Sequence, residues 1–342
     1  MHVEEAQGTY HGEAANFADL VYEGLPGEGN VVAIDTLDSE SDVLRLRVLD
    51  RGAPLQPGAG CEGGGGPGFA AVCAIHEPRG PELVPSGFHG ATAVPRTRWV
   101  DTMRISLDDG DDSFDAASFT RELEASFSMS VSSGAGDDQI ATGSGSDVVE
   151  PGRGFDSVQT GDGADTVIAT PSPDGPDRYD LGSEVYVPAT IAAADKVDYG
   201  LRSAPVHWTE REAGAPGEGD TLKGAEVVIG GSGDDVLSGG DYEDVVVGGP
   251  GSDVLSGGGN WDSLLGGPGA DLLFGGAEND RLGGGRGRDS LHGGAGSDAL
   301  VGGLGADRLY GGAAVDVLRC GAGRDVAWRP GRDRQRGCEL RR

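Results

Sequence analysis

The nine residues GGPGADLLF, at positions 266–274, are followed without a gap by GGAENDRLG, at positions 275–283. The same spacing continues in both directions, and residues 230–328 divide into eleven nine-residue units. A unit almost always begins with two glycines, and it has aspartate sixth and an apolar residue eighth. So many units in one phase indicate a repeat architecture, and this array decides the fold.

Each unit combines a turn with a short strand. The glycine-rich first six residues predict a tight turn, and the last three predict a strand whose middle side chain points inward. Two units then form one coil, with a strand on each side of a thin apolar core and turns along both edges. The predicted inward residues are Leu237, Val246, Leu255, Leu264, Leu273, Leu282, Leu291, Leu300, Leu309, Leu318 and Ala327. We therefore predict an all-β fold, a parallel β-roll or β-solenoid of nonapeptide repeats with an N-terminal β-rich region.

The sixth-position aspartates form one column on each edge, because same-edge turns are 18 residues apart. Such columns repel unless a cation lies between the turns, and ligation by oxygens alone favours calcium over zinc or magnesium. The alternative is that each aspartate only closes its own turn. The predicted ligands are Asp235, Asp253, Asp271, Asp289, Asp307 and Asp325 on the first edge, Asp244, Asp262, Asp280, Asp298 and Asp316 on the second, and the turn glycines Gly230, Gly248, Gly266, Gly284 and Gly302.

The fourth position of the unit differs between the two edges. Every first-edge turn has glycine there, whereas the second edge has Tyr242, Asn260, Glu278, Gly296 and Ala314. If the turn needs a left-handed backbone at this point, each other residue costs about 1 kcal/mol or distorts the carbonyl ligands. We predict a regular calcium column on the first edge and a sparse or weaker one on the second. The alternative is that both edges bind alike because glycine only eases folding.

The pattern Gly-Gly-x-Gly-x-Asp-x-apolar-x resembles the haemolysin-type calcium-binding repeat, the RTX parallel β-roll. The resemblance covers residues 230–328 and implies several bound calcium ions and a β-roll that folds as calcium enters. More loosely, the flanking stretches DRGAPLQPGAGC and CGAGRDVAWRPGRDRQRGCE resemble segments of secreted calcium-binding repeat proteins of actinobacteria.

Outside the main array the chain divides into four further parts. We expect an N-terminal β-strand region (residues 1–106), degenerate repeats (107–170), a non-repeat insert (171–229) and a basic C-terminal cap (329–342). The degenerate repeats keep the second and fourth glycines but lack the first. Whether their aspartates bind calcium stays open, and these weaker candidates are Asp138, Asp147, Asp156 and Asp165.

The four cysteines form two close pairs, Cys61/Cys73 and Cys320/Cys338. No Cys-x-x-Cys motif or suitably spaced histidine completes a zinc site, so two disulfides are favoured over free thiols or metal. Disulfides indicate an extracellular protein. The start MHVEEAQGTY lacks the basic and apolar regions of a secretory signal, so we expect export by a signal that has been removed. No apolar run is long enough to predict a membrane span.

The charge and the motifs bear on function. A formal net charge of −31 argues against nucleic acid as a partner. The chain has no His-Glu-x-x-His, Gly-x-Ser-x-Gly, P-loop or dinucleotide motif, although a pair of catalytic carboxylates stays open. We therefore predict a secreted, non-enzymatic calcium-binding β-roll that acts at the cell surface or in the extracellular matrix. One alternative is a β-roll appended to an unrecognised hydrolase.

Two outward rows of side chains suggest other partners. The row Phe274, His292, Tyr310 and Trp328 predicts either a carbohydrate-binding adhesin or an aromatic ladder that stacks on itself. On the opposite face, Val245, Val247, Leu265, Val301 and Val317 point outward, which favours a covering partner. The N-terminal β region of the same chain is the first candidate. The basic C-terminal segment, predicted to cap the last coil, could instead bind an anionic wall polymer.

Overall fold

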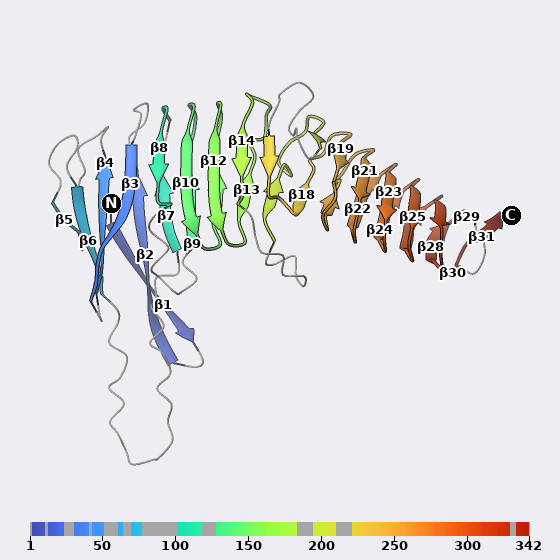
Figure 1. Cartoon of the computed structure of the whole chain (residues 1–342), viewed down its shortest axis with the longest axis horizontal. Coiled ribbons are helices and arrows are strands. Elements are labelled where there is room, and N and C mark those ends of the chain that lie inside the picture. The colour runs from blue at the N-terminus through green and yellow to red at the C-terminus, as the bar shows by residue number, and fades with distance from the viewer. Residues whose placement is uncertain are drawn as a thin grey trace, which may run out of the picture.

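The computed structural model describes residues 2–10, 13–23, 31–40, 43–50, 61–63, 70–76, 102–107, 109–117, 128–182, 194–209, 221–328 and 333–341. Among these residues there is no helix, and the strands form three sheets of a β-solenoid (Figure 1). The predicted all-β, parallel solenoid is therefore confirmed. Within the same residues, no helix could cross a bilayer.

One sheet of fourteen strands, here called the continuous sheet, extends from the first described strand to the C-terminal cap. Its first two strands pair antiparallel, and every later pair is parallel. Its strands are β1 (His2–Tyr10), β2 (Glu13–Glu23), β7 (Thr102–Ser106), β9 (Ser128–Ser132), β11 (Val148–Glu150), β13 (Thr166–Ile168), β15 (Lys196–Asp198), β18 (Val227–Ile229), β20 (Val245–Val247), β22 (Ser263–Gly269), β24 (Arg281–Gly287), β26 (Ala299–Gly305), β28 (Val317–Gly323) and β30 (Arg334–Arg336).

The opposite face is divided into two sheets. The N-terminal sheet contains β17 (Thr221–Lys223), β14 (Arg178–Asp180), β12 (Ser157–Asp162), β10 (Gln139–Ser144), β8 (Ser113–Asp115), β3 (Val31–Glu40), β4 (Val43–Asp50), β6 (Ala70–His76) and β5 (Cys61–Gly63). The C-terminal sheet contains β16 (His207–Trp208), β19 (Val236–Ser238), β21 (Val254–Gly258), β23 (Leu272–Ala277), β25 (Ser290–Ala295), β27 (Arg308–Gly312), β29 (Val326–Trp328) and β31 (Glu339–Arg341). Figure 1 shows that the solenoid bends near this division.

The core is a column of the eighth-position side chains. Each of the predicted inward residues, from Leu237 to Ala327, is buried. Same-face strands stack with a register of 18 residues, as in the pairing of Leu255 with Leu273 and of Leu273 with Leu291. The predicted two-unit coil is therefore confirmed.

The N-terminal strands extend both faces of the solenoid. A hairpin of β1 and β2 joins the continuous sheet through β7, and β3 joins the N-terminal sheet through β8. Cys61 and Cys73 are backbone partners in β5 and β6, but their side chains, and so their predicted disulfide, lie outside the described part. The domain boundaries stay predictions. Residues 171–229, expected as a non-repeat insert, contribute β14, β15, β16, β17 and β18 to the two faces.

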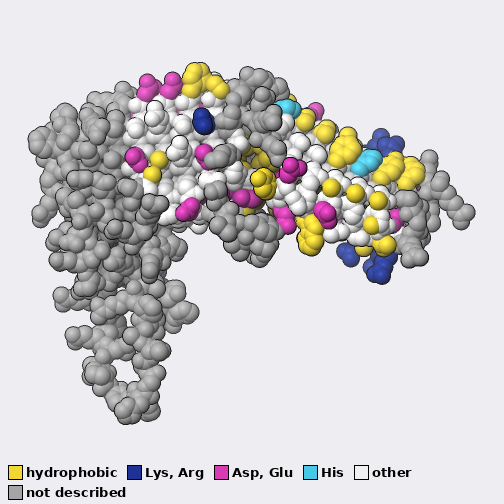
Figure 2. Space-filling model, viewed as in Figure 1, with side chains coloured by type: hydrophobic (Ala, Val, Ile, Leu, Met, Phe, Trp, Pro, Cys, Tyr) yellow, Lys and Arg dark blue, Asp and Glu magenta, His cyan; other side chains and the backbone are white. Residues whose placement is uncertain are grey.

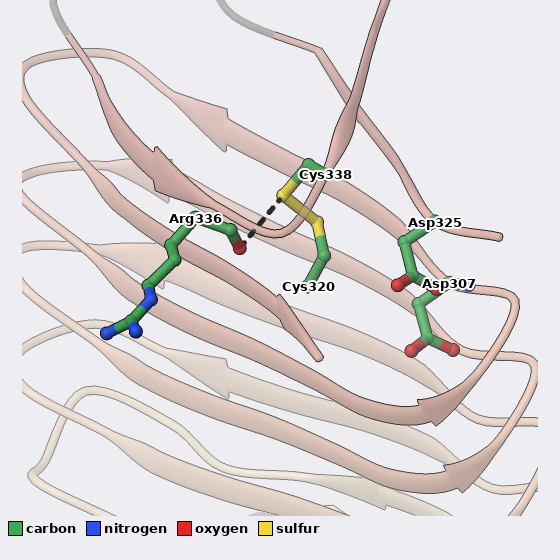
Figure 3. The surroundings of a disulfide bond; sticks show 5 residues. All are labelled: Asp307, Cys320, Asp325, Arg336 and Cys338. Carbon is green, nitrogen blue, oxygen red and sulfur yellow. Dashed lines mark hydrogen bonds between the residues drawn. A yellow bond between two sulfur atoms is a disulfide. The ribbon is translucent and has the colours of Figure 1, made fainter. Parts of the chain in front are cut away.

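The C-terminal segment adds a last strand to each face. Strand β30 pairs with β28, and β31 pairs with β29. The predicted Cys320–Cys338 disulfide is present and joins this segment to the last coil (Figure 3). Arg334 and Arg336 are exposed here, and Figure 2 shows basic side chains gathered toward this end of the solenoid.

Candidate calcium cradles along the two edges

The column aspartates lie buried between rungs and bond to the backbone of the neighbouring rung. Oδ1 of Asp271 accepts the N–H of Asp253 at 3.0 Å, and Oδ1 of Asp280 accepts that of Asp262 at 2.9 Å. The pattern repeats along the first edge to Asp325. It also repeats along the second edge. One oxygen of each carboxylate is thus used to hold successive turns in register.

The other carboxylate oxygen, Oδ2, is hydrogen-bonded only in the first turn of each edge of the main array. Oδ2 of Asp235 and of Asp244 accepts the N–H of Gly231 and Gly240, at 2.8 and 3.0 Å. Further along, Oδ2 is buried and accepts no hydrogen bond in Asp253, Asp262, Asp271, Asp280, Asp289, Asp298, Asp307, Asp316 and Asp325. An unsatisfied buried oxygen costs about 1–3 kcal/mol, and more when charged. These turns therefore need a cation or a proton at Oδ2.

The first residue of these turns is glycine, so no side chain lies beside these oxygens. A Cβ atom placed on Gly248 would lie 2.4 Å from Oδ2 of Asp253 and 2.8 Å from the carbonyl oxygen of Gly266. On the second edge, a Cβ on Gly275 would lie 2.4 Å from Oδ2 of Asp280 and 2.6 Å from the carbonyl oxygen of Gly293. In such turns a carboxylate oxygen and a main-chain carbonyl oxygen lie close together beside a first-position glycine, an arrangement here called a cradle.

The chemistry of the cradle fits a hard cation. Carboxylate and carbonyl oxygens in a flexible arrangement are the ligands that calcium prefers, and the first-edge turns offer Asp253, Asp289 and Asp307 with the carbonyls of the next rung. Among the described residues, no three His, Cys, Asp or Glu side chains gather into a metal cluster. An ion in a cradle therefore depends on main-chain carbonyls for much of its coordination.

Burial shifts the acidity of the column aspartates. It raises the pKa of Asp253 and of Asp262 to about 7, and that of Asp280, Asp289 and Asp298 to about 6. Backbone hydrogen bonds oppose the rise, and neighbouring carboxylates add to it. Without a cation the folded columns therefore hold protons that the unfolded chain would release.

The fourth position of the turn adopts a different backbone on each edge. On the first edge Gly287 and Gly305 have φ of 140° and 147°, which L side chains rarely adopt. On the second edge Asn260, Glu278 and Ala314 have φ of 65°, 72° and 76°, a left-handed conformation open to other residues at some cost. The cradles at the first glycine are alike on both edges. The weaker second calcium column therefore stays a prediction.

The degenerate repeats build the same aspartate columns. Oδ1 of Asp156 accepts the N–H of Asp138 at 3.0 Å, and Oδ1 of Asp165 accepts that of Asp147 at 2.9 Å. Burial raises the pKa of Asp156 to about 8. These residues are therefore rungs of the solenoid, but their turns begin with a side chain and not with glycine.

Five acidic residues that the sequence analysis missed extend the columns: Asp112, Asp177, Asp195, Glu226 and Asp333. The side chains of Asp177, Asp195, Glu226 and Asp333 each accept the main-chain N–H of an aspartate one rung away. The main-chain N–H of Asp112 donates to the carboxylate of Asp138. The separations at Asp177, Asp195 and Glu226 are 21, 30 and 31 residues, so insertions hide them from a nine-residue period. For all but Asp333, the signal that could have found them is an acidic residue immediately before a three-residue strand with an apolar middle residue.

The outward aromatic residues stack on one another. Ring centroids are 5.1 Å apart for Phe274 and His292, 4.5 Å for His292 and Tyr310, and 4.2 Å for Tyr310 and Trp328, with interplanar angles of 24°, 6° and 9°. The predicted self-stacking ladder is confirmed. Its inner ring faces are covered by neighbouring rings, so a sugar could reach only ring edges and the two ends of the stack.

The opposite face carries the predicted outward apolar side chains. Leu265, Val301 and Val317 are exposed, at 48%, 43% and 36% of their surface, while Val245 and Val247 are half-buried. Single exposed apolar residues are normal, and Leu265 and Val301 are separated along the sheet by Gly283. The covering partner stays a prediction.

Fold and site together define a class of protein: a parallel β-roll whose edge turns present oxygen cradles for calcium. The family model of the RTX calcium-binding nonapeptide repeat matches residues 130–149, 143–170, 229–260, 256–291 and 292–327. The chain therefore contains RTX calcium-binding repeats, in its main array and in its degenerate one. No curated protein matches the chain.

Proposed function

We propose that this protein is a secreted, non-enzymatic calcium-binding protein whose β-roll folds as calcium enters, and that it acts at the cell surface or in the extracellular matrix. The observation that carries the proposal is the row of buried Oδ2 atoms without a hydrogen bond, several of which, such as those of Asp253, Asp280 and Asp289, lie beside a glycine and a carbonyl oxygen of the next rung. A cation bound only by the folded form adds its binding free energy to folding.

Two properties support an extracellular setting. The Cys320–Cys338 disulfide suits an oxidising compartment. The formal charge of −31 disfavours compaction until cations neutralise it. Extracellular calcium modules have dissociation constants of about 0.1–1 mM, so a protein made in a calcium-poor cytosol would fold mainly after export.

Circular dichroism of the whole chain during a calcium titration tests the proposal. We expect the β-structure content to increase with calcium while the size of the chain, measured by light scattering, decreases. Magnesium at the same concentration should have little effect. A spectrum that does not change between chelator and excess calcium would refute the proposal.

Polysaccharide binding by the aromatic ladder is the second candidate, favoured only by the exposed edge of the stack. Retention on immobilised polysaccharides, compared for the wild type and Tyr310→Ala, tests it. Equal retention of the two proteins leaves the ladder a purely structural element.

A further inference from the structure

The surface charge of the β-roll reverses part of the way along it. Residues 230–280 contain no lysine or arginine, and the acidic side chains that reach the surface there are Asp234, Asp241, Glu243 and Glu278. From residue 281 onward Glu339 is the only exposed acid among the described residues, because the others are buried column aspartates. The exposed arginines of this part are Arg281, Arg286, Arg288, Arg308, Arg319, Arg324, Arg334 and Arg336. Figure 2 shows most of the basic side chains toward this end of the solenoid.

Half of these arginines lie on the outer face of the continuous sheet, and three of them form a cluster. Arg319 of β28 pairs directly with Arg336 of β30. Arg334 lies two residues before Arg336 in the same strand, so both side chains point to the same face. Paired residues of adjacent strands are about 4.8 Å apart, and residues two apart in one strand are about 7 Å apart. Three positive charges are thus held close together at one end of the sheet.

No acidic side chain neutralises this cluster on its own face. The other outward residues of β24, β26, β28 and β30 are Arg281, Gly283, Ala299, Val301 and Val317. None of the clustered arginines forms an ion pair with another described residue. Like charges on directly paired residues destabilise a sheet. An anion bound between these arginines would remove that repulsion.

The shape of this face limits the kind of anion that can bind. Each strand turns two side chains outward, at the seventh and ninth positions of the unit, so the face is about 7 Å wide. An anionic bilayer or a nucleic-acid duplex is much wider, and it would also cover acidic turns such as those of Asp241 and Glu278. The formal charge of −31 repels such large anionic surfaces. A single polymer chain can follow the narrow face and avoid the acidic turns.

We propose that this face binds one chain of an acidic polysaccharide. The guanidinium groups would pair with sulfate or carboxylate groups, which arginine binds with two parallel hydrogen bonds. The exposed Val301 and Val317 lie between the arginines and would contact the apolar faces of the sugar rings. The site, here called the arginine strip, consists of Arg281, Val301, Val317, Arg319, Arg334 and Arg336. It is separate from the calcium cradles, and the aromatic ladder lies on the C-terminal sheet.

Binding of the whole protein, in excess calcium, to three dextrans of equal length tests the inference. We expect dextran sulfate or carboxymethyl dextran to bind and uncharged dextran not to bind, and the tighter of the two charged polymers identifies the acidic group. A flexible polyanion releases about 0.7 counterion per contact, so four arginine contacts predict a slope of about −3 for log affinity against log salt. Equally tight binding of uncharged dextran would assign retention to the aromatic ladder and would overturn the inference.

A pair of matched double variants locates the site. Arg319→Ala combined with Arg336→Ala should weaken binding of dextran sulfate about tenfold and reduce the salt slope to about −1.5. Arg153→Ala combined with Arg178→Ala removes the same charge from exposed positions of the degenerate repeats and the insert, and should change the affinity less than twofold. Thermal unfolding verifies that both variants are folded.

Two results of these measurements would overturn the inference. Equal losses in the two double variants would show that dextran sulfate responds to net charge and not to the arginine strip. Tighter binding to phosphatidylglycerol vesicles than to dextran sulfate, lost in the Arg319/Arg336 variant, would make the same face a membrane-binding surface.

Discussion

Adding one methyl group at Gly287 tests how tightly the rungs are stacked. This glycine has φ of 140°, and a Cβ placed on it would lie 1.4 Å from the carbonyl oxygen of Gly269, one rung earlier. No side chain can remain at that distance, so Gly287→Ala must separate the rungs. The strain alone costs about 1–2 kcal/mol. Two or three broken rung hydrogen bonds add about 1 kcal/mol each, for a total of about 4 kcal/mol.

Two variants in the same array serve as comparisons. Gly283→Ala lies on the outer face, where the nearest atom to the new Cβ is the flexible Cδ1 of Leu265 at 3.2 Å, and we expect a change below about 0.5 kcal/mol. Ala314→Gly relieves a φ of 76° but adds chain entropy to the unfolded state. We expect it to stabilise by up to about 1 kcal/mol.

Thermal unfolding in excess calcium, followed by circular dichroism, measures all three variants. For a unit of this size 1 kcal/mol corresponds to about 2–4 °C, so Gly287→Ala should melt roughly 10 °C below the wild type. A melting temperature within about 2 °C of the wild type would show that the rungs can separate freely, and it would refute the reasoning.

Four further predictions follow from the edges and from the cap. Asp271→Ala should reduce calcium affinity in titration calorimetry more than Asp280→Ala, and equal losses would contradict the edge asymmetry. Burial raises the pKa of column aspartates in the folded protein to about 6 or 7, so the calcium-free fold should be most stable near pH 4 and should lose stability as the pH rises through 7. Denaturant midpoints measured in chelator test this, and a midpoint that rises with pH would contradict it. Replacing Cys320 and Cys338 together by serine should cost about 3 kcal/mol in denaturant unfolding, and an unchanged midpoint argues against a stabilising cap. Tyr310→Ala removes two stacking contacts, each worth about 0.5–1.5 kcal/mol, and should lower the melting temperature; an unaltered one would assign the ladder no role in stability.

The fold of the main array was predictable because each structural role falls at the same position of every nine-residue unit. Leu273 must fill the core, Asp271 must hold the next turn, and Gly266 must leave room beside the carboxylate. A strict period makes each of these visible without knowledge of the pairing. The two-strand coil and the 18-residue column follow from the alternation of side chains.

The junction was not predictable in the same way. Asp177 and Asp195 hold the columns across insertions, and only the observed strand pairing places them in line with Asp156 and Asp165. Arg202 is fully buried there, with its Nε donating to the carbonyl oxygen of Thr170 at 2.9 Å. A buried arginine in a non-repetitive segment has no sequence signal, because its partners come from a coil some thirty residues away.

The continuous sheet has a mechanical consequence. Between neighbouring rungs the hydrogen bonds point along the solenoid axis. Tension along this axis therefore pulls directly on them and separates the rungs one after another. Among the described strands, only those of the continuous sheet pair across the division between β17 and β16, through β15, β18 and β20. Under tension the solenoid should therefore separate first at this division, where strands pair on one face only. The rungs on either side would then extend independently.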